Sequence, residues 1–299
     1  MITQLVPSLL QPKLGRLHQY SPIPLRIGNL PAAAQFLDAP TVSVVIPSYE
    51  QGRFIDRTIR SLINQRYPAL ELIVQDGGSK DETLDVLKKH EKVLTSWFCE
   101  PDSGQSEAIN KGFARTNGEI MAWINSDDLL LPGALHHVAR FFLSHPEVDV
   151  LYGNRLMIDE RDCEIGRWIL PGHDAELLSW VDFIPQETLF WRRSLWEKVG
   201  ARVDESLRFA MDWDLLLRFR KVGAVFAHLP HFLGAFRVHG LQKTSSEMHT
   251  VGKVEMERLR LREFGRVPSR WEFRRAIIPF IFRHMIADWK HSARQRFAY

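Results

Sequence analysis

Two adjacent carboxylates, Asp127 and Asp128, follow the apolar segment EIMAWIN after a single serine, where a buried strand is expected to end. Like charges at this spacing raise each other's pKa unless a cation or several hydrogen-bond donors neutralise them. Mg²⁺ and Mn²⁺ prefer carboxylate oxygens together with the phosphates of a substrate. The pair therefore indicates a divalent-cation site for a phosphorylated ligand. Taken alone, it has a second interpretation, in which both carboxylates only cap the turn that contains Pro132 and Gly133.

Three further polar loops occupy the same position relative to apolar segments. They are PSYEQG after SVVI, DGGSKD after ELIVQ, and PDSGQ after SWFCE. Segments with helical spacing, such as GRFIDRTIRSLINQRYP, separate the apolar segments, and this alternation predicts a largely parallel sheet with helices on both faces. Ligands bind beyond the carboxyl ends of the strands in such sheets. We therefore expect all four loops to line one crevice.

The rest of the chain adds elements around this core. Helical spacing predicts helices over GALHHVARFFLSHP and MDWDLLLRFRKVG, whereas VDVLYGNRLMI and EIGRWIL are predicted strands, some of them antiparallel. Ser79 and Glu82 fit a capping box at the start of a helix over ETLDVLKKH. Residues 1–40, rich in proline and leucine, are expected to form an N-terminal extension.

Composition limits the possible functions. The 299 residues are 45% hydrophobic and 25% charged, which is typical of a globular protein rather than a disordered one. The formal net charge of +3 is too small to indicate a nucleic-acid partner. The chain has no G-x-G-x-x-G, Walker A, H-E-x-x-H or G-x-S-x-G motif. The usual sequence grounds for a dehydrogenase, P-loop NTPase, zinc protease or α/β-hydrolase are therefore missing.

The cysteines and the lengths of the apolar runs indicate the cellular compartment. Cys99 and Cys163 have neither metal-ligand spacing nor the density of a disulfide scaffold, and are expected to be packed thiols in a reducing compartment. The proline-interrupted N-terminus is not typical of a signal peptide. No apolar run reaches the roughly 18 to 20 residues of a membrane-spanning helix. We therefore predict a cytoplasmic location.

The tail over residues 246–299 differs from the rest of the chain. Its segment WEFRRAIIPFIFRHMIADWKHSARQRF mixes tryptophan, phenylalanine and isoleucine with arginine and lysine. Such a mixture is typical of a basic amphipathic helix that lies on an anionic membrane surface. The alternative is a pair of terminal helices docked on the main domain.

The motifs in their order resemble one known family. VSVVIPSYEQGRFIDRTIRSLINQRYPALELIVQDGGSKDET, PDSGQSEAINKGF and GEIMAWINSDDLLLPGAL together are similar to the family 2 glycosyltransferases, which have the GT-A fold. The resemblance extends over residues 42–240. It implies a Rossmann-like α/β domain over residues 41–245, with three layers (α/β/α), a mostly parallel central sheet, and a C-terminal helical segment after it. Residues 41–130 would form its nucleotide-binding half and residues 131–245 its acceptor half.

The resemblance implies roles for the crevice loops. Four residues match the segment that lines the nucleotide pocket: Pro47, Ser48, Tyr49 and Glu50. Asp76 matches the aspartate that hydrogen-bonds the base; a carboxylate accepts the imide N–H of uracil or thymine, which favours a UDP or TDP donor. Taken alone, Asp76 is equally well a loop residue before two glycines. Gly104 and Gln105 begin a helix whose backbone amides are expected to face the nucleotide or its phosphates.

The resemblance also implies a cofactor, Mn²⁺ or Mg²⁺. Asn125 to Asp128 match the D-x-D-type motif, with Asn125 where many members have aspartate. Metal ligation is therefore expected mainly at Asp128, with Asp127 beside it in contact with ribose or metal. His239, in FRVHGLQKTS, matches a histidine that can complete the metal shell, the alternative being a structural histidine.

The acceptor half supplies the predicted catalytic base. In FAMDWDLLLRF, Met211 and Asp212 match the family's Glu-Asp pair, and the resemblance implies that Asp212 takes the proton from the acceptor hydroxyl. Asp214 is a weaker candidate because it falls inside the helix. Arg237 and Lys243 are expected to contact the diphosphate.

These assignments predict a metal-dependent, inverting glycosyltransferase that moves a sugar from a UDP- or TDP-sugar to an acceptor hydroxyl. The family context suggests cell-surface polysaccharide or glycolipid assembly, with a saccharide or lipid-linked acceptor at the inner face of the membrane and peripheral contact through the tail. Two alternatives remain. A noncatalytic nucleotide-sugar-binding subunit is favoured by Met211 and Asn125, and a sugar nucleotidyltransferase is disfavoured because PSYEQGRF is a poor phosphate loop. Residues 152–193 carry no motif that identifies the sugar or acceptor.

Overall fold

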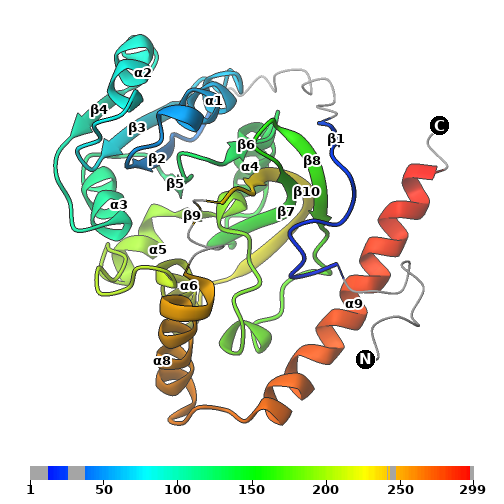
Figure 1. The fold of residues 1–299 in the computed structure, drawn as a ribbon. Helices are drawn as coiled ribbons and strands as arrows, with labels where there is room; N and C mark the ends of the chain where they lie inside the picture. Colours follow the sequence, from blue (N-terminus) through cyan, green and yellow to red (C-terminus); the bar gives the residue numbers. More distant parts are fainter. Residues whose placement is uncertain (1–12, 26–37, 241, 243–246, 297–299) are drawn as a thin grey trace.

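The computed structural model describes residues 13–25, 38–240, 242 and 247–296 (Figure 1). Most of the predicted N-terminal extension, and the predicted diphosphate contact Lys243, therefore lie outside the described residues. The helices are α1 Gly52–Ile63, α2 Thr83–His90, α3 Gln105–Phe113, α4 Ala134–Ser144, α5 Arg193–Lys198, α6 Met211–Lys221, α8 Lys253–Phe264 and α9 Arg270–Arg296.

One mixed sheet runs through the described part of the chain. Its order is β1-β8-β7-β9-β5-β2-β3-β4, and β10 pairs with both β7 and β6. The strands are β1 Ile23–Pro24, β2 Val42–Ser48, β3 Leu70–Asp76, β4 Ser96–Cys99, β5 Ile120–Trp123, β6 Leu129–Leu130, β7 Val150–Ile158, β8 Cys163–Trp168, β9 Phe190–Arg192 and β10 Phe226–Arg237.

The first half of the sheet is parallel, as the alternation of strands and helices predicts. Strands β4, β3, β2 and β5 are parallel neighbours, so their carboxyl ends meet at one edge. Beyond β5 the sheet is mixed, because β9 lies antiparallel between β5 and β7 whereas β10 is parallel to β7. The edge that carries the four polar loops is therefore continued by strands of the predicted acceptor half.

Helices cover both faces of the sheet, which confirms the predicted three layers. Val44 and Ile46 of β2 belong to the cluster formed with α1, α2 and α4, and Val45 belongs to the cluster formed with α3, α5 and α6. Successive strand residues point to opposite faces, which explains this division. Helix α3 approaches β2 so closely that a Cβ atom at Gly112 would lie 2.4 Å from Val45 Cγ1, so this position needs glycine.

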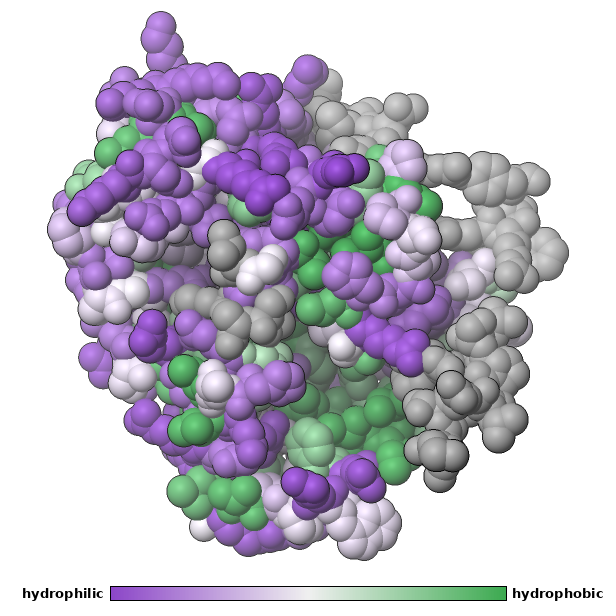
Figure 2. Space-filling model, in the orientation of Figure 1, coloured by the Kyte–Doolittle hydropathy of each residue, from purple (hydrophilic) through white to green (hydrophobic). Residues whose placement is uncertain are grey.

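The C-terminal helices α8 and α9 follow the sheet, and α9 packs against the main domain, as one interpretation of the tail predicts. Phe280 is 1% exposed, and His284 Nδ1 lies 2.7 Å from the Ile169 carbonyl oxygen. Hydrophobic residues nevertheless gather at the lower right of Figure 2, alongside the lower half of α9 in Figure 1. Large exposed side chains on this helix are Trp271, Ile278, Phe282, Ile286 and Trp289. No helix among the described residues is long and apolar enough to cross a bilayer.

Two local predictions were wrong. Ser79 forms no capping box, because its hydroxyl donates to Asp76 Oδ2 at 2.7 Å and α2 begins at Thr83 without a side-chain cap. Cys99 is exposed rather than packed, because it ends the edge strand β4, whereas Cys163 is half-buried.

Candidate active site

The loops after β2 and β3 are tied to each other. The Glu50 amide donates to Ser79 Oγ at 2.6 Å, and the Gly52 amide donates to Asp81 Oδ2 at 2.9 Å. Glu50 has a φ of 52°, a left-handed conformation that is uncommon outside glycine and is retained here by these contacts. The two predicted nucleotide loops therefore converge, as expected from their positions at the carboxyl ends of parallel strands.

The predicted nucleotide-binding residues of β2 differ in accessibility. Pro47 and Ser48 are buried at the end of the strand, whereas Tyr49 is 58% exposed and Glu50 is also exposed. The Ser48 hydroxyl has no hydrogen-bond partner within the described part of the chain. An exposed aromatic ring next to a buried hydroxyl is suited to contact a base or ribose.

Asp76 is fully buried at the end of β3 and already accepts several hydrogen bonds. The Gly78 and Ser79 amides donate to Oδ1 at 3.0 and 2.8 Å, and the Ser79 hydroxyl donates to Oδ2. A carboxylate has about four lone-pair sites, so one remains for a base. Cys99 lies beside it, and desolvation of the thiol together with the nearby charge of Asp76 raises the pKa of the Cys99 thiol.

Asp127 lies against the predicted metal ligand His239. Its Oδ2 atom is 2.9 Å from His239 Nε2, although 112 residues separate the two in sequence. The imidazole is almost wholly buried and packs on Phe54 with ring centroids 4.8 Å apart. Arg237 Nε donates to the Asp127 carbonyl oxygen at 2.7 Å, which fixes the backbone here. A carboxylate and an imidazole that face each other form a donor pair that Mn²⁺ accepts.

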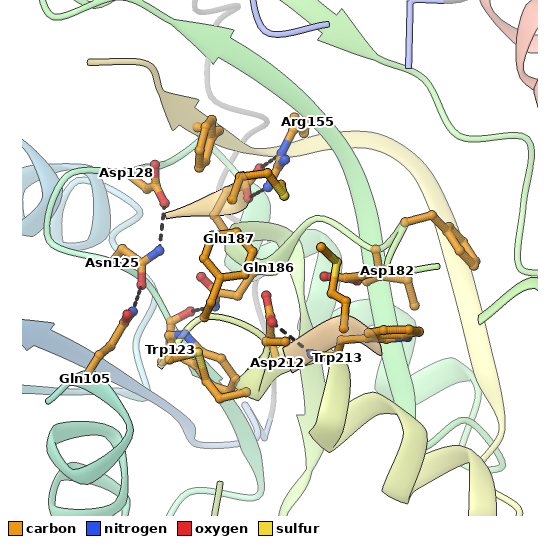
Figure 3. Close-up of a pocket in the computed structure, with 18 of the residues that line it drawn as sticks. Gln105, Trp123, Asn125, Asp128, Arg155, Asp182, Gln186, Glu187, Asp212 and Trp213 are labelled. Carbon is orange, nitrogen blue, oxygen red and sulfur yellow. Dashed lines mark hydrogen bonds and ion pairs between the residues drawn. The ribbon is translucent and has the colours of Figure 1, made fainter. Parts of the chain in front are cut away.

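Asp128 points away from this pair. Its Oδ1 accepts the Arg237 amide at 2.9 Å, and its Oδ2 accepts Asn125 Nδ2 at 3.3 Å. Burial, with the adjacent Asp127 charge next in effect, raises the pKa of Asp128 well above its ordinary value. Asn125 also accepts from Gln105 Nε2 at 2.6 Å (Figure 3). An amide at 125 therefore stabilises Asp128, where an aspartate would repel it.

The other predicted diphosphate contact, Arg237, is fully buried. Its Nη1 donates to the Asp159 carbonyl oxygen at 3.0 Å and pairs with Asp162. These contacts give Arg237 a structural role in joining β10 to the D-x-D-type turn.

A cavity beside Asp128 contains the predicted base (Figure 3). Asp212 is the second residue of α6, and its Oδ1 accepts the Trp213 amide at 2.8 Å. A helix N-terminus favours the ionised carboxylate. Asp214 is instead buried and paired with Arg218 at 2.8 Å and with Arg262, so it lies outside the cavity.

Tryptophan side chains near the sheet differ in whether they reach this cavity. Trp123 and Trp213 line it, whereas Trp191 is fully buried in the core.

Four polar residues of the cavity were not predicted from the sequence: Arg155, Asp182, Gln186 and Glu187. Arg155 Nε donates to Glu187 Oε1 at 2.7 Å, and its Nη2 pairs with Glu187 Oε2. The guanidinium lies between Trp168 and Phe236, 4.8 and 4.6 Å from their ring centroids. These residues come from β7 and from the segment before β9, and no local motif marks them.

Glu187→Gln should destabilise the fold strongly. Removing one partner of a buried ion pair leaves the Arg155 charge uncompensated, which costs about 3 kcal/mol or more. Urea unfolding measures this, with Glu160→Gln as the control, since Glu160 forms an exposed pair with Arg53 that contributes at most about 1 kcal/mol. Equal stability of the two variants would contradict the buried-pair assignment.

Among the described residues, no group of three or more histidine, cysteine, aspartate or glutamate side chains could hold a metal by itself. The Asp127–His239 pair would thus need further ligands from a bound molecule, such as phosphate oxygens. Such incomplete protein shells are ordinary for cations that bind together with substrate phosphates.

Sequence comparison shows which known proteins this chain resembles. The profile of glycosyl transferase family 2 matches residues 43–167. An uncharacterized glycosyltransferase of Mycobacterium tuberculosis is 30% identical over 185 residues, covering 60% of this chain and 69% of that protein. The teichuronic acid biosynthesis glycosyltransferase TuaG of Bacillus subtilis is 37% identical over 92 residues, covering 30% of this chain and 36% of TuaG.

Solved structures share the fold. Residues 1–349 of S. aureus TarS, in complex with UDP-GlcNAc, match with a TM-score of 0.62 at 20% identity, over 82% of this chain and 72% of that one. The chain spans 43% of a longer TarS chain. The mannosyltransferase PcManGT of Pyrobaculum calidifontis, in complex with GDP-Man and Mn²⁺, matches with a TM-score of 0.56 at 17% identity, over 83% of this chain and 70% of that one.

Proposed function

This chain belongs to glycosyl transferase family 2 and is a glycosyltransferase, and from that premise we propose that it transfers a sugar from a UDP- or TDP-sugar to an acceptor hydroxyl with inversion. The observation that carries the proposal is the junction of two sites. The turn that pairs Asp127 with His239 continues through Asp128 and Asn125 into the cavity that holds Asp212. A leaving diphosphate and an attacking hydroxyl would thus meet on opposite sides of one sugar.

The donor nucleotide would lie over the loops after β2, β3 and β4. Asp76 has one acceptor position left for the imide N–H of uracil or thymine, and Tyr49 offers an exposed ring beside it. The complex of TarS with UDP-GlcNAc supports a uridine nucleotide here. Gly104 and Gln105, at the start of α3, would place backbone amides toward the nucleotide.

Asp127 and His239 would hold Mn²⁺ or Mg²⁺, in place of the predicted main ligand Asp128. The donor set fits, because one carboxylate and one imidazole already face each other at 2.9 Å. The Mn²⁺ in the PcManGT complex is consistent with this cofactor. When bound, the cation supplies Lewis-acid stabilisation of the leaving diphosphate.

Asp212 would act as the general base. It would accept the proton of the acceptor hydroxyl while that oxygen attacks the anomeric carbon from the face opposite the diphosphate. The C–O bond to the diphosphate breaks as the new one forms, so a single displacement inverts the anomeric centre. The Trp213 amide donates to Asp212 Oδ1 at 2.8 Å and orients the carboxylate for this role.

Product analysis tests the proposal against its rivals. A purified glycosyltransferase of this kind should release UDP or TDP from the donor, with the sugar on an acceptor or on water. Release of pyrophosphate from a nucleoside triphosphate would indicate a nucleotidyltransferase. Nucleotide-sugar binding without any sugar release would favour the noncatalytic subunit.

The acceptor setting we propose is polysaccharide assembly at the inner face of a membrane, for which the similarity to TuaG is the support. Contact with the membrane would come from α9. Its exposed hydrophobic side chains recur at helical spacing, and Trp271 and Trp289 are 70% and 68% exposed. Five exposed lysine or arginine residues accompany them among the side chains that the structure describes: Arg270, Arg274, Arg275, Arg283 and Lys290. Such a face suits a bilayer surface that contains anionic lipid.

Changing Trp271 and Trp289 together to serine should weaken binding to vesicles that contain phosphatidylglycerol by at least about tenfold, because it removes most of the apolar area offered by two rings. Point changes are preferable to deletion of the tail, since Phe280 and His284 of α9 are buried against the domain. Leu143→Ser, at an exposed position of α4, is the matched control. Unchanged vesicle sedimentation of the double variant would remove α9 from membrane binding.

A further inference from the structure

The cavity that contains Asp212 has an excess of acidic groups. Its described lining includes four carboxyl side chains and a single basic side chain, that of Arg155. The carboxyl groups belong to Asp128, Asp182, Glu187 and Asp212 (Figure 3). An anion that entered this space would therefore face an environment of its own sign.

The one basic group does not offset this excess. Arg155 gives two of its donors to Glu187 and is covered by Trp168 and Phe236. The arginine and Glu187 together are neutral, so the net charge of the cavity wall is negative whenever any of Asp128, Asp182 and Asp212 is ionised. A bound uronate or phosphate would have to break this buried pair to gain a cationic partner.

Two buried oxygen atoms on the wall are acceptors without partners. Gln186 is 8% exposed, and its Nε2 donates to the Trp123 carbonyl oxygen at 2.8 Å, which fixes the amide orientation. Its Oε1 atom, like Asp182 Oδ1, is buried and has no hydrogen-bond partner within the described residues. Buried acceptors without partners are costly, and they point to a ligand that brings donors.

Other lining side chains use their donors on protein acceptors. Gln105 Nε2 donates to Asn125 at 2.6 Å, Asn125 Nδ2 donates to Asp128, and Trp213 Nε1 donates to the Leu178 carbonyl oxygen at 2.7 Å. The cavity therefore presents mostly acceptors. Hydroxyl and ammonium groups of a sugar would satisfy them, whereas carboxylate and phosphate oxygens would not.

We propose that this cavity selects a reacting saccharide without negative charge, and that Asp182 and Gln186 are the residues that accept hydrogen bonds from it. The proposal rests on the proposed function and names its substrate class: neutral or amine-bearing sugars are bound, and uronic acids or sugar phosphates are rejected. Burial, with the charge of Asp212 next in effect, raises the pKa of Asp182 well above its ordinary value, which reflects the cost of an ionised carboxylate in this space. A bound ammonium group or hydroxyl hydrogen next to these carboxyl groups favours their ionised form.

Three hexose probes test the selection: glucosamine, glucose and glucuronate. Their dissociation constants are measured by ligand-observed NMR titration on the full-length protein, with and without UDP and Mn²⁺. Wild-type protein should bind glucosamine and glucose at least about tenfold more tightly than glucuronate, as expected for one charge in a partly solvated pocket. Asp182→Asn should reduce this preference severalfold, and Asp85→Asn, at an exposed position of α2, should leave it unchanged.

Glucuronate binding as tight as that of glucose in the wild-type protein would overturn the proposal, and so would failure of both glucose and glucosamine to bind. A preference that survives Asp182→Asn in full would remove Asp182 from the recognition. UDP binding is titrated on the same samples. Its absence would count against the proposed donor and not against the charge selection, since the probes can be compared without nucleotide.

Discussion

Asp212→Asn should lower the rate of sugar transfer by about 100- to 10,000-fold, the usual contribution of a general base. Asparagine keeps the shape of the side chain, and its oxygen can still accept the Trp213 amide that now donates at 2.8 Å. It cannot take a proton from the acceptor hydroxyl. Binding of the nucleotide should be unchanged, because Asp212 lies in the cavity, away from the loops after β2 and β3. Initial rates of UDP release in the presence of acceptor measure the effect.

Asp85→Asn provides the control for this change. It makes the same substitution at an exposed position on α2, where the carboxylate forms a surface pair with Lys88. Its rate should equal that of the wild-type protein. Turnover of Asp212→Asn within a few-fold of wild type would show that another group takes the proton, and Asp182 would become the next candidate.

Asp127→Asn should remove the activation by Mn²⁺, with a loss of about 100-fold or more in rate, equivalent to several kcal/mol of transition-state stabilisation. The reason is that Asp127 and His239 are the facing carboxylate and imidazole at the turn, and an amide is a poor ligand for a hard cation. His239→Gln should also lower the rate and its activation by Mn²⁺. The dependence of rate on Mn²⁺ concentration measures both.

Asp128→Asn distinguishes this account from one in which Asp128 is the main ligand. The carboxyl of Asp128 is buried and accepts from the Arg237 amide and from Asn125, so its loss should disturb the fold of the turn rather than metal affinity. The apparent affinity for Mn²⁺ should therefore fall much more in Asp127→Asn than in Asp128→Asn. The reverse order would restore the assignment made from sequence.

Much of this arrangement could be predicted from local patterns. Short apolar runs that alternate with amphipathic segments predict parallel strands, and the order of strands predicts where their polar loops converge. That argument needs no contact information, and the converging loops of Glu50 and Asp81 confirm it. The family and its three-layer fold were predicted correctly from the motifs. The roles of Asp76, Asp212 and the other site residues stay predictions.

The remaining features depend on contacts between distant parts of the chain. Asp127 and Asp128 are neighbours with opposite surroundings, because β10 brings His239 to one and the Arg237 amide to the other. Sequence spacing alone cannot show which of two adjacent aspartates in a turn faces the histidine and which is buried. Arg155 and Glu187 are joined across 32 residues of chain, and neither belongs to a periodic pattern that would mark it. The sequence predicts that Arg237 contacts the diphosphate. In the structure its side chain is buried and forms an ion pair with Asp162.

Calorimetric titration with UDP, in the presence and absence of Mn²⁺, tests the central claim most directly. The wild-type protein should bind UDP more tightly with Mn²⁺ than without it, and should bind CDP more weakly, because Asp76 is placed to accept the imide N–H of uracil and cytosine has no such donor. Asp127→Ala should abolish the gain from Mn²⁺. Equal UDP binding with and without Mn²⁺, or no binding of any nucleotide, would contradict the assignment of this crevice as a metal-assisted nucleotide-sugar site.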